Sequence, residues 1–340
     1  MPTRELPRKA AIETVRLYHQ ARLEGMTRNQ AAHHIAKLLN VGPSTIRARL
    51  DYSIPRTYPD IEINHDLAPP PPEPVIAPQK PRVSVKATGE VVRVCAIGDL
   101  HDSPKLSDKA RFAWIGRHIT ATKPDKVVQI GDFGDWNSCS THEAIGSTDY
   151  AERPSYKRDV ESMEQALTAM YRETGGDFAM HLLEGNHEDR IDRFENNHPE
   201  TNGLLREQID SLYARFNWRP MRFGQWLFIA GVGFTHVPKT IMGRAYGGKF
   251  SENQIGNDAM FSIVYGHTHR AVFKRVPKIG PQQAIEILNL GSAMPDGYIA
   301  SYAGTAMTGW TYGIYDLRLR AGHIENHRFI SMRELEELYG

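Results

Sequence analysis

The stretch VVRVCAIGDLH, residues 91–101, joins a short apolar run directly to a glycine, an aspartate and a histidine. Four later segments share this layout, in which possible metal ligands follow an apolar run: residues 131–135 (GDFGD), 185–188 (GNHE), 235–236 (TH) and 266–269 (GHTH). The carboxyl ends of strands meet at one edge of an open α/β sheet, so these five segments can converge in space. Each segment is a weak signal by itself, and the ordered set of five is a strong one.

Short apolar runs and longer amphipathic ones alternate through this region, which is typical of βαβ units. The pattern predicts strands at 91–98, 126–131 and 178–185, and helices at 108–122 and 155–173. After Trp218, strand-like runs follow at 226–235, 260–266, 284–290, 310–320 and 323–330. We therefore predict a mixed α/β sandwich.

The residue types in the five segments favour a catalytic metal centre. Carboxylate oxygens and imidazole nitrogens suit divalent manganese, iron or zinc, and a carboxylate that bridges two ions lets both contact one phosphoryl group. Asp132 is the best candidate for that bridge. The only cysteines are Cys95 and Cys139, too few for a structural zinc site or a disulfide framework. The alternative, that these residues are strand-end caps, requires ligand types to coincide with strand ends five times.

In their order, these segments resemble the motifs of the calcineurin-like metallophosphoesterase superfamily over residues 90–330. The resemblance implies an α/β fold, with a four-layer β-sandwich flanked by helices. It also implies two divalent metal ions, with manganese ahead of iron, zinc and nickel. One ion would be held by Asp99, His101, Asp132 and His269, and the other by Asp132, Asn186, His236 and His267.

The same resemblance implies that His187 is catalytic without being a ligand. It would protonate the leaving oxygen or stabilise its charge, while a hydroxide that bridges the two ions at Asp132 attacks phosphorus. Two positions depart from the family's pattern, because Glu188 stands where many members have aspartate and residues 133–134 fill the spacer before Asp135. We expect Glu188 to orient His187 and Asp135 to position a histidine or close a loop; a purely structural role fits the sequence equally well for both.

Three further segments have competing interpretations. Residues 289–292 (NLGS) resemble a turn that closes the site in family members, or are an ordinary turn after a strand. Residues 136–142 follow the second motif, so Trp136 or His142 would contact substrate if this segment lines a groove, whereas a plain surface loop is the alternative. The alternation of Trp310, Tyr312 and Ile314 with intervening residues predicts the packed face of a strand.

Residues 1–56 form a candidate helix-turn-helix domain. A capping box at Thr27 precedes a helix over 31–39, Pro43 starts another helix that continues to Leu50, and an earlier helix covers about 10–24. The last helix would present four side chains to a DNA major groove: Ser44, Thr45, Arg47 and Arg49. Residues 1–60 hold ten Lys and Arg against five Asp and Glu, and this net charge of +5 favours binding to a phosphate backbone. A small protein-docking or oligomerisation bundle is the alternative.

A proline-rich linker at 57–88 separates this head from a body at 89–340. Seven prolines hold its backbone near polyproline II: Pro69, Pro70, Pro71, Pro72, Pro74, Pro78 and Pro81. Over all 340 residues, 41 Lys and Arg oppose 40 Asp and Glu, so overall charge does not decide the partner. The N-terminus lacks an apolar signal segment and no run is long enough to cross a membrane, so we expect a cytoplasmic protein without a membrane partner.

The basic head and the metal motifs together favour a nuclease-like phosphodiesterase that acts on nucleic acid, DNA more than RNA, as expected of phage or prokaryotic DNA-processing proteins. A phosphomonoesterase acting on a small molecule, nucleotide or phosphoprotein would share the same metal motifs, so the sequence does not separate the two activities. A DNA-binding adaptor without turnover is a third hypothesis, and the complete set of ligands argues against it. The sequence is also compatible with a homodimer.

Overall fold

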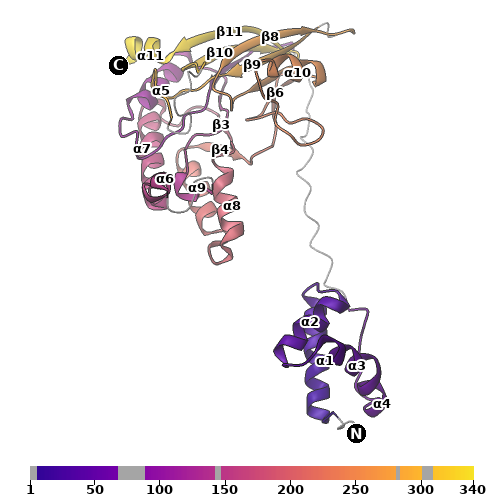
Figure 1. Cartoon of the computed structure of the whole chain (residues 1–340). Helices are drawn as coiled ribbons and strands as arrows, with labels where there is room; N and C mark the ends of the chain where they lie inside the picture. The colour runs from indigo at the N-terminus through magenta and orange to yellow at the C-terminus, as the bar shows by residue number, and fades with distance from the viewer. Residues whose placement is uncertain (1–5, 68–88, 142–146, 281–283, 301–308) are drawn as a thin grey trace. The chain divides into compact units, whose positions relative to one another are not determined.

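The computed structural model describes residues 6–67, 89–141, 147–280, 284–300 and 309–340. The chain divides into two compact units, a head within residues 1–80 and a body within residues 81–340, and each is described by itself (Figure 1). Within the described ranges, every helix is too short or too polar to span a lipid bilayer. The seven prolines of the predicted linker lie outside these ranges.

The head is all helical. Its elements are α1 (Arg8–Leu23), α2 (Arg28–Leu38), α3 (Pro43–Ala48), a π-helical turn (Arg49–Ser53) and α4 (Ile54–Thr57). The predicted capping box is present at the start of α2, where the Thr27 hydroxyl accepts from the Gln30 amide at 3.3 Å and the Gln30 side chain accepts from the Thr27 amide at 2.9 Å. Pro43 lies in the first turn of α3, where its missing N–H costs nothing.

The core of the head is formed by the inward faces of these helices. Tyr18, Ile35, Ile46 and Ile54 are almost fully buried, since the sequence places apolar residues three or four positions apart on each helix. Tyr58, Ile61 and Ile63 also pack against this core. The packed head therefore extends beyond residue 56 into the segment that the sequence assigned to the linker.

Six strands form the first sheet of the body, in the order β11-β10-β1-β2-β3-β4. The strands β1 (Val92–Ile97), β2 (Lys126–Gln129), β3 (Met180–Leu183) and β4 (Trp218–Met221) run parallel, and β10 (Gly313–Arg320) and β11 (His323–Ser331) extend the sheet as antiparallel neighbours. The helices of this part are α5 (Ala110–Thr122), α6 (Thr148–Ala151), α7 (Tyr156–Thr174), α8 (Asp189–Asn197), α9 (Leu204–Arg215) and α11 (Met332–Tyr339), with short 3-10 turns at Asn137–Cys139 and Pro199–Thr201. The predicted βαβ alternation is confirmed.

Five strands form the second sheet, in the order β5-β6-β7-β9-β8. They are β5 (Leu227–Ile229), β6 (Val232–Phe234), β7 (Ile263–Tyr265), β8 (Ala271–Pro277) and β9 (Ala284–Leu290). The strands β6, β7 and β9 are parallel, and the helix α10 (Ser251–Asp258) packs on β8 and β9.

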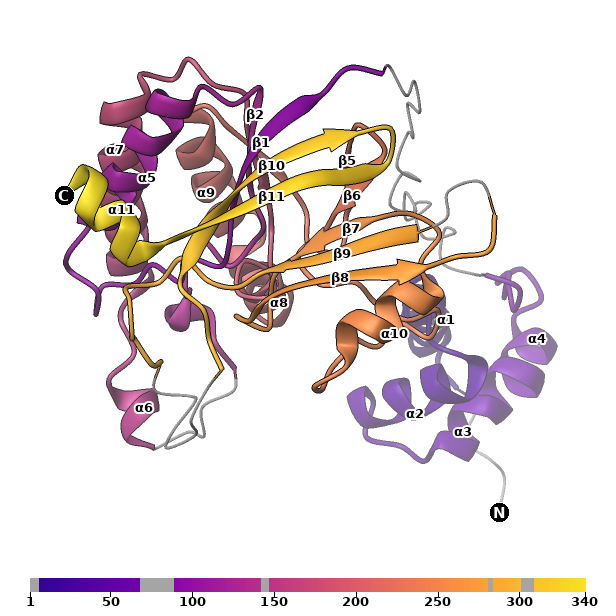
Figure 2. The same cartoon turned by 90° about the horizontal axis from the view of Figure 1, so that it is seen from above.

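The body has four layers, which confirms the predicted fold class. Figure 2 shows α5, α7 and α11 beside the first sheet and α10 against β8 of the second. Alternate residues of β1 serve two cores: Cys95 and Ile97 pack under the helices, and Val94 and Ala96 pack between the sheets. Because both faces of β1 are covered, its sequence is almost continuously apolar.

Two predicted strands differ from the structure. The run at 226–235 is a hairpin of β5 and β6, turned at Ala230 and Gly231, whose φ angles are 47° and 84°. The run at 310–320 enters its strand only at Gly313, so the expectation that Trp310 lies on the packed face of a strand is wrong. Sequence periodicity missed the turn at Ala230 and Gly231, because two apolar residues do not interrupt the hydrophobic pattern.

Candidate metal centre

The polar segments that follow five strands meet at one edge of the body. Asp99 follows β1, Asp132 follows β2, Asn186 follows β3, His236 follows β6, and His267 and His269 follow β7. Backbone hydrogen bonds link these loops directly: the Leu100 and His101 amides both donate to the Asp132 carbonyl, at 3.0 and 2.9 Å. These hydrogen bonds fix the loop after β1 relative to the loop after β2.

One group of possible ligands consists of Asp99, His101 and His269, all buried. The Nε2 atoms of His101 and His269 lie 2.9 Å apart. The His269 Nε2 atom is also 3.1 Å from Asp99 Oδ2. Three side chains from two different sheets thus direct their ligand atoms to one point.

A second group consists of Asp132, His236 and His267, with Asn186 beside them. Asn186 Oδ1 lies 3.1 Å from His236 Nε2 and 2.9 Å from His267 Nδ1. Asp132 Oδ2 lies 3.2 Å from the same His236 nitrogen. Asn186 and His267 are only partly buried, so this group faces solvent.

The Asp132 carboxylate lies between the two groups. Its Oδ2 atom is 3.2 Å from His236 Nε2 in one group and 3.9 Å from His101 Nε2 in the other. Asp132 therefore lies within reach of ligand atoms of both groups.

Four of the candidate ligands have a left-handed backbone conformation. The φ angles are 46° for His101, 51° for Asp132, 72° for His267 and 57° for His269. This conformation is unfavourable for residues other than glycine, and such outliers concentrate at functional sites. The fold therefore holds these side chains in place against a local energetic preference.

Glycines next to the ligands leave room for the carboxylates. A Cβ atom on Gly185 would lie 2.5 Å from the Asp132 amide nitrogen and closer still to Asp132 Oδ1. A Cβ atom on Gly266 would lie 2.6 Å from Ile130 Cγ2 and closer to Asp99 Oδ1. Both glycines have ordinary φ angles, so steric space alone requires them.

We predict that Gly185→Ala lowers metal affinity at least about 10-fold, as loss of a supporting contact does at metal sites. The added methyl group would displace the Asp132 carboxylate, because no flexible side chain is there to give way. Calorimetric titration with manganese measures the effect. Gly247→Ala is the matched control, since nothing lies within 4 Å of a Cβ atom at that position. Equal metal affinity in both variants would contradict this account of Gly185.

Asp135 contacts two of the histidines. Its Oδ1 atom lies 2.8 Å from His101 Nδ1 and 3.5 Å from His187 Nδ1. A carboxylate at Nδ1 leaves the Nε2 atom of His101 directed at the first group of ligands. Burial opposes ionisation of Asp135, but the two histidines lower the pKa of this carboxyl overall.

Glu188 does not orient His187, and that expectation is wrong. Its buried carboxylate instead accepts three backbone hydrogen bonds, from Asp132 (2.9 Å), Gly134 (3.1 Å) and Gly185 (2.8 Å). Glu188 therefore ties the loop after β2 to the loop after β3. The longer glutamate side chain reaches both loops from its place at the start of α8.

His187 lies beside both groups, and its ring forms a third buried set of possible ligands with His101 and Asp132. Its backbone amide donates to Asp132 Oδ1 at 2.9 Å, and its Nδ1 atom is 3.0 Å from the Asp135 carbonyl oxygen. The ring packs edge-on against His101 with a centroid distance of 4.6 Å. Burial lowers the pKa of His187, but the Asp132 and Asp135 carboxylates more than offset it and raise the pKa overall.

The carboxylates make the centre anionic, and the pKa of His236 reflects this negative charge. Burial lowers the pKa of His236, yet the Asp132 and Asp99 carboxylates outweigh burial and raise that pKa to about 9. A site of this charge favours cations.

The structure adds supporting residues around the ligands; the sequence interpretation singled out neither Arg190 nor Arg193, and it gave Trp310 and Asn289 other roles. Arg190 and Arg193 extend from α8, where Arg193 Nη2 donates to the Asn186 carbonyl at 3.2 Å. Trp310 is half-buried and packs edge-on against His269 with a centroid distance of 4.6 Å. Asn289 donates to the Thr268 hydroxyl and so supports the loop between His267 and His269. The spacing of Arg190, three residues after His187 at the start of a helix, was the available signal for that residue.

Trp136 does not line a substrate groove. Its side chain is only 1% exposed and belongs to the core under the helices, near Tyr156. The alternative prediction, a plain surface loop, is also wrong at Trp136. His142 lies outside the described residues.

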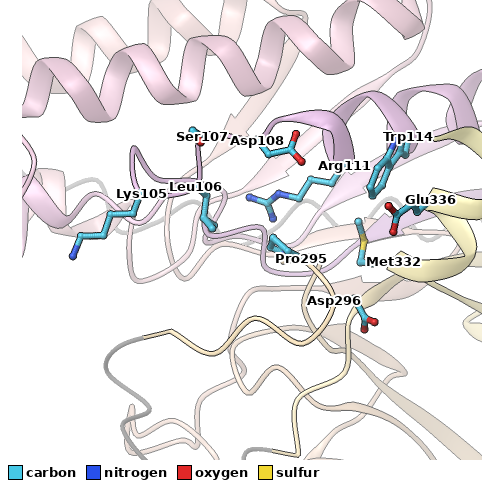
Figure 3. Close-up of a pocket in the computed structure, with 10 residues that line it drawn as sticks. All are labelled: Lys105, Leu106, Ser107, Asp108, Arg111, Trp114, Pro295, Asp296, Met332 and Glu336. Atoms are coloured by element: carbon cyan, nitrogen blue, oxygen red, sulfur yellow. The ribbon is translucent and has the colours of Figure 1, made fainter.

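Figure 3 shows a separate cavity of about 420 Å³ between the start of α5 and α11. It is lined by residues of both charges and by none of the candidate ligands: Lys105, Leu106, Ser107, Asp108, Arg111, Trp114, Pro295, Asp296, Met332 and Glu336. The buried Arg111 donates from Nη1 to the carbonyls of Leu100 and Ala293, at 2.7 Å each. Arg111 thus ties the loop after β1 to the loop that contains Ala293.

Comparison with known proteins identifies the family. Residues 92–271, more than half of the chain, match the calcineurin-like phosphoesterase family. This chain is a calcineurin-like phosphoesterase. The resemblance inferred from the sequence is confirmed, and the enzyme is a metal-dependent phosphoric ester hydrolase.

Solved structures similar to this phosphoesterase are distant in sequence. Yfce, a phosphoesterase from E. coli, is 14% identical with a TM-score of 0.32, and the match covers 69% of this chain and 98% of that chain. Vps29 from Entamoeba histolytica, complexed with Zn²⁺, is 12% identical with a TM-score of 0.29, over 71% of this chain and 99% of that chain. No curated protein matches the chain.

The residues of the centre fit the divalent metals that the calcineurin-like phosphoesterases use. Asp99 Oδ1 is buried and has no hydrogen-bond partner among the described residues. His101 and His269 direct ring nitrogens at each other, a contact in which one nitrogen must lack a proton. An orphaned carboxylate oxygen and converging imidazole nitrogens are the donor set of a divalent cation.

Proposed function

We propose that this phosphoesterase is a two-metal phosphodiesterase that cleaves nucleic acid, DNA more than RNA. The observation that carries the proposal is the position of the Asp132 carboxylate, which belongs to the second ligand group and lies 3.9 Å from His101 Nε2 of the first. Asp99, His101, Asp132 and His269 would hold one ion, and Asp132, Asn186, His236 and His267 the other. Manganese is the expected metal, with iron, zinc and nickel as alternatives.

When bound, the two ions would supply an activated water molecule and neutralise charge on the phosphoryl oxygens. The protein's own residues arrange the reaction. Asp135 fixes the His101 ring, and the Asp135 carbonyl oxygen holds His187 through Nδ1, so Nε2 of His187, beside Arg190 Nη2, is the nitrogen that would face the substrate. His187 then lies at the leaving oxygen, where it would donate a proton or stabilise the developing charge.

A basic and apolar hairpin beside the centre supports a polyanionic substrate. Residues 237–250 contain Lys239, Arg244 and Lys249 and no acidic residue. The hairpin is closed by pairing of Lys239 with Ala245, and its tip residue Ile241 is fully exposed. Lys239 lies 4.6 Å over the Phe223 ring, which packs 6.2 Å from the His236 ring. Phosphates would meet the cations of this hairpin close to the second ligand group.

We predict that the triple change Lys239→Ser, Arg244→Ser and Lys249→Ser weakens single-stranded DNA binding. Each lost phosphate contact removes counterion release, so the slope of log affinity against log salt should flatten by about two. Fluorescence anisotropy with a labelled oligonucleotide at several salt concentrations measures the slope.

The control for this prediction changes three basic residues on the exposed face of α7 to serine: Lys157, Arg158 and Arg172. This variant loses the same charge elsewhere on the body and should keep the wild-type slope. If both triple variants flatten the slope equally, the hairpin is not a specific contact and the prediction is wrong.

The head is proposed to bind DNA through α3 and the turn that follows it. Ser44, Thr45 and Arg47 are exposed and Arg49 is partly exposed, so these side chains are accessible to a partner. We expect Arg47→Ser to weaken binding to duplex DNA several-fold, with Arg16→Ser on α1 as the control because Arg16 pairs with Glu13 at 2.7 Å. DNA affinity unchanged by Arg47→Ser would favour a protein-docking role for the head.

A substrate panel tests the proposed activity. Manganese-loaded protein is assayed with bis(p-nitrophenyl) phosphate, p-nitrophenyl phosphate and labelled single- and double-stranded DNA and RNA. The proposal predicts hydrolysis of the diester and of nucleic acid. Hydrolysis of the monoester alone would replace the proposed activity with that of a phosphomonoesterase, and DNA binding without any hydrolysis would favour an adaptor.

A further inference from the structure

Arg190 is held rigidly beside the reactive edge of His187. Its Nη1 atom donates to the Asp135 carbonyl at 2.7 Å and to Asn137 Oδ1 at 2.9 Å. Its Nη2 atom lies 3.2 Å from His187 Nε2. Two acceptors on one nitrogen fix the planar guanidinium, so the position of Nη2 is set by the fold.

The charge of Arg190 has no carboxylate partner among the described residues. Its hydrogen-bond partners there are a backbone carbonyl, a side-chain amide and an imidazole. The first two are uncharged, and the imidazole is uncharged in its neutral form. Arg206 nearby shows the contrast, since it pairs with Glu184 at 2.8 Å and with Asp192 at 2.5 Å. A partly buried cation without a counterion is expected to attract an anion.

The contacts of His187 indicate where that anion would lie, next to the Nε2 side of its ring. His187 Nδ1 faces the Asp135 carbonyl, so Nε2, which lies beside Arg190 Nη2, is the ring nitrogen that would face a substrate. Any ester oxygen that reaches Nε2 also comes within reach of Arg190 Nη2, which lies beside it. A guanidinium stays protonated, and it can donate to this oxygen whatever the state of the imidazole.

We propose that Arg190 is a catalytic residue that donates a hydrogen bond from Nη2 to the leaving oxygen of the phosphate ester. As water adds to phosphorus, the bond from phosphorus to the leaving oxygen breaks and its electron pair stays on that oxygen. Arg190 stabilises this charge until His187 donates a proton to the oxygen, the proton that the attacking water releases balances this transfer, and the guanidinium keeps its own protons. The inference rests on the proposed phosphodiesterase function and assigns a residue to the leaving group.

This role makes the effect of Arg190 depend on the leaving group. A poor leaving group, such as an alkoxide or a sugar hydroxyl, carries more charge at the transition state and needs more stabilisation than p-nitrophenolate does. Arg190→Gln should therefore lower kcat about 10²-fold to 10³-fold for alkyl esters, as loss of one oxyanion donor does. The loss for p-nitrophenyl esters should be about 10-fold or less.

The experiment measures kcat for a series of p-nitrophenyl, phenyl and alkyl esters with the manganese-loaded full chain. Wild type is compared with Arg190→Gln and Arg190→Lys, and with Arg215→Gln as a control at an exposed arginine that pairs with Glu164. Asn137→Ala, which removes one anchor of Arg190, should show the same dependence on leaving group to a smaller extent. Arg190→Lys should recover part of the loss, because lysine keeps the positive charge but lacks the planar pair of N–H donors of the guanidinium.

A second readout is independent of turnover. Calorimetry with inorganic phosphate should show weaker binding to Arg190→Gln than to wild type, while thermal melting and manganese content stay close to wild type. Equal losses of kcat across the ester series, or unchanged phosphate affinity, would overturn the role of Arg190 while leaving the phosphoesterase proposal intact. If wild type hydrolyses no ester in the series, the proposed function fails and the role of Arg190 fails with it.

Discussion

Replacing Asp132 by asparagine should lower kcat/KM for diester hydrolysis by more than about 100-fold, which is the upper range for loss of a residue that only supports a metal ligand. Asp132 Oδ2 is close to a ring nitrogen in each ligand group, 3.2 Å from His236 Nε2 and 3.9 Å from His101 Nε2. An amide keeps the shape of the side chain and removes the negative charge that both ions would share. Steady-state kinetics with bis(p-nitrophenyl) phosphate at saturating manganese measures the effect.

Asp125→Asn provides the same chemical change at an exposed position, where the carboxylate pairs with Arg93 at 3.2 Å. This control should keep the wild-type kcat/KM. An Asp132→Asn protein that is folded and hydrolyses the diester within about 10-fold of wild type would show that the carboxylate is not shared between two ions.

Replacing Glu188 by alanine should lower the free energy of unfolding of the body by at least about 3 kcal/mol. The carboxylate accepts hydrogen bonds from the amides of Asp132, Gly134 and Gly185, and alanine would leave three buried N–H groups without an acceptor. Burial and the nearby Asp132 carboxylate raise the pKa of Glu188, so the cost of burying its charge offsets part of the gain. Urea unfolding followed by tryptophan fluorescence measures the change.

Glu188→Gln separates the hydrogen bonds from the size of the side chain. The amide oxygen can still accept from Asp132 and Gly185, but the NH₂ group would oppose the Gly134 N–H, so this variant should lie between wild type and Glu188→Ala. Glu161→Ala, on the exposed face of α7, should change stability by less than about 0.5 kcal/mol. Equal stability of Glu188→Ala and Glu161→Ala would refute the role assigned to Glu188.

The sequence predicted the fold class and the positions of the candidate ligands for a common physical reason. Each ligand segment follows an apolar strand, and the carboxyl ends of parallel strands must meet at one edge. Asp99 after β1 and Asp132 after β2 therefore come together in any such sheet. The capping box at Thr27 was also predictable, because all its contacts lie within four residues.

The features that the sequence did not predict depend on contacts between distant segments. Trp136 follows a metal motif, but its burial is decided by packing against α7, which no local pattern reveals. Glu188 was paired in the prediction with its neighbour His187, whereas its partners include Asp132 and Gly134, more than 50 positions away. The side chain of Arg190 is likewise positioned by Asp135 and Asn137 on another loop.

The most direct test of the two-metal phosphodiesterase is a manganese titration of protein that has been stripped with chelator. Bound manganese per chain and hydrolysis of bis(p-nitrophenyl) phosphate are measured on the same samples. We predict no hydrolysis by stripped protein, and activity that rises with bound metal and saturates at two ions per chain. Hydrolysis by the stripped protein, or full occupancy of the site without hydrolysis of any phosphate ester, would contradict it.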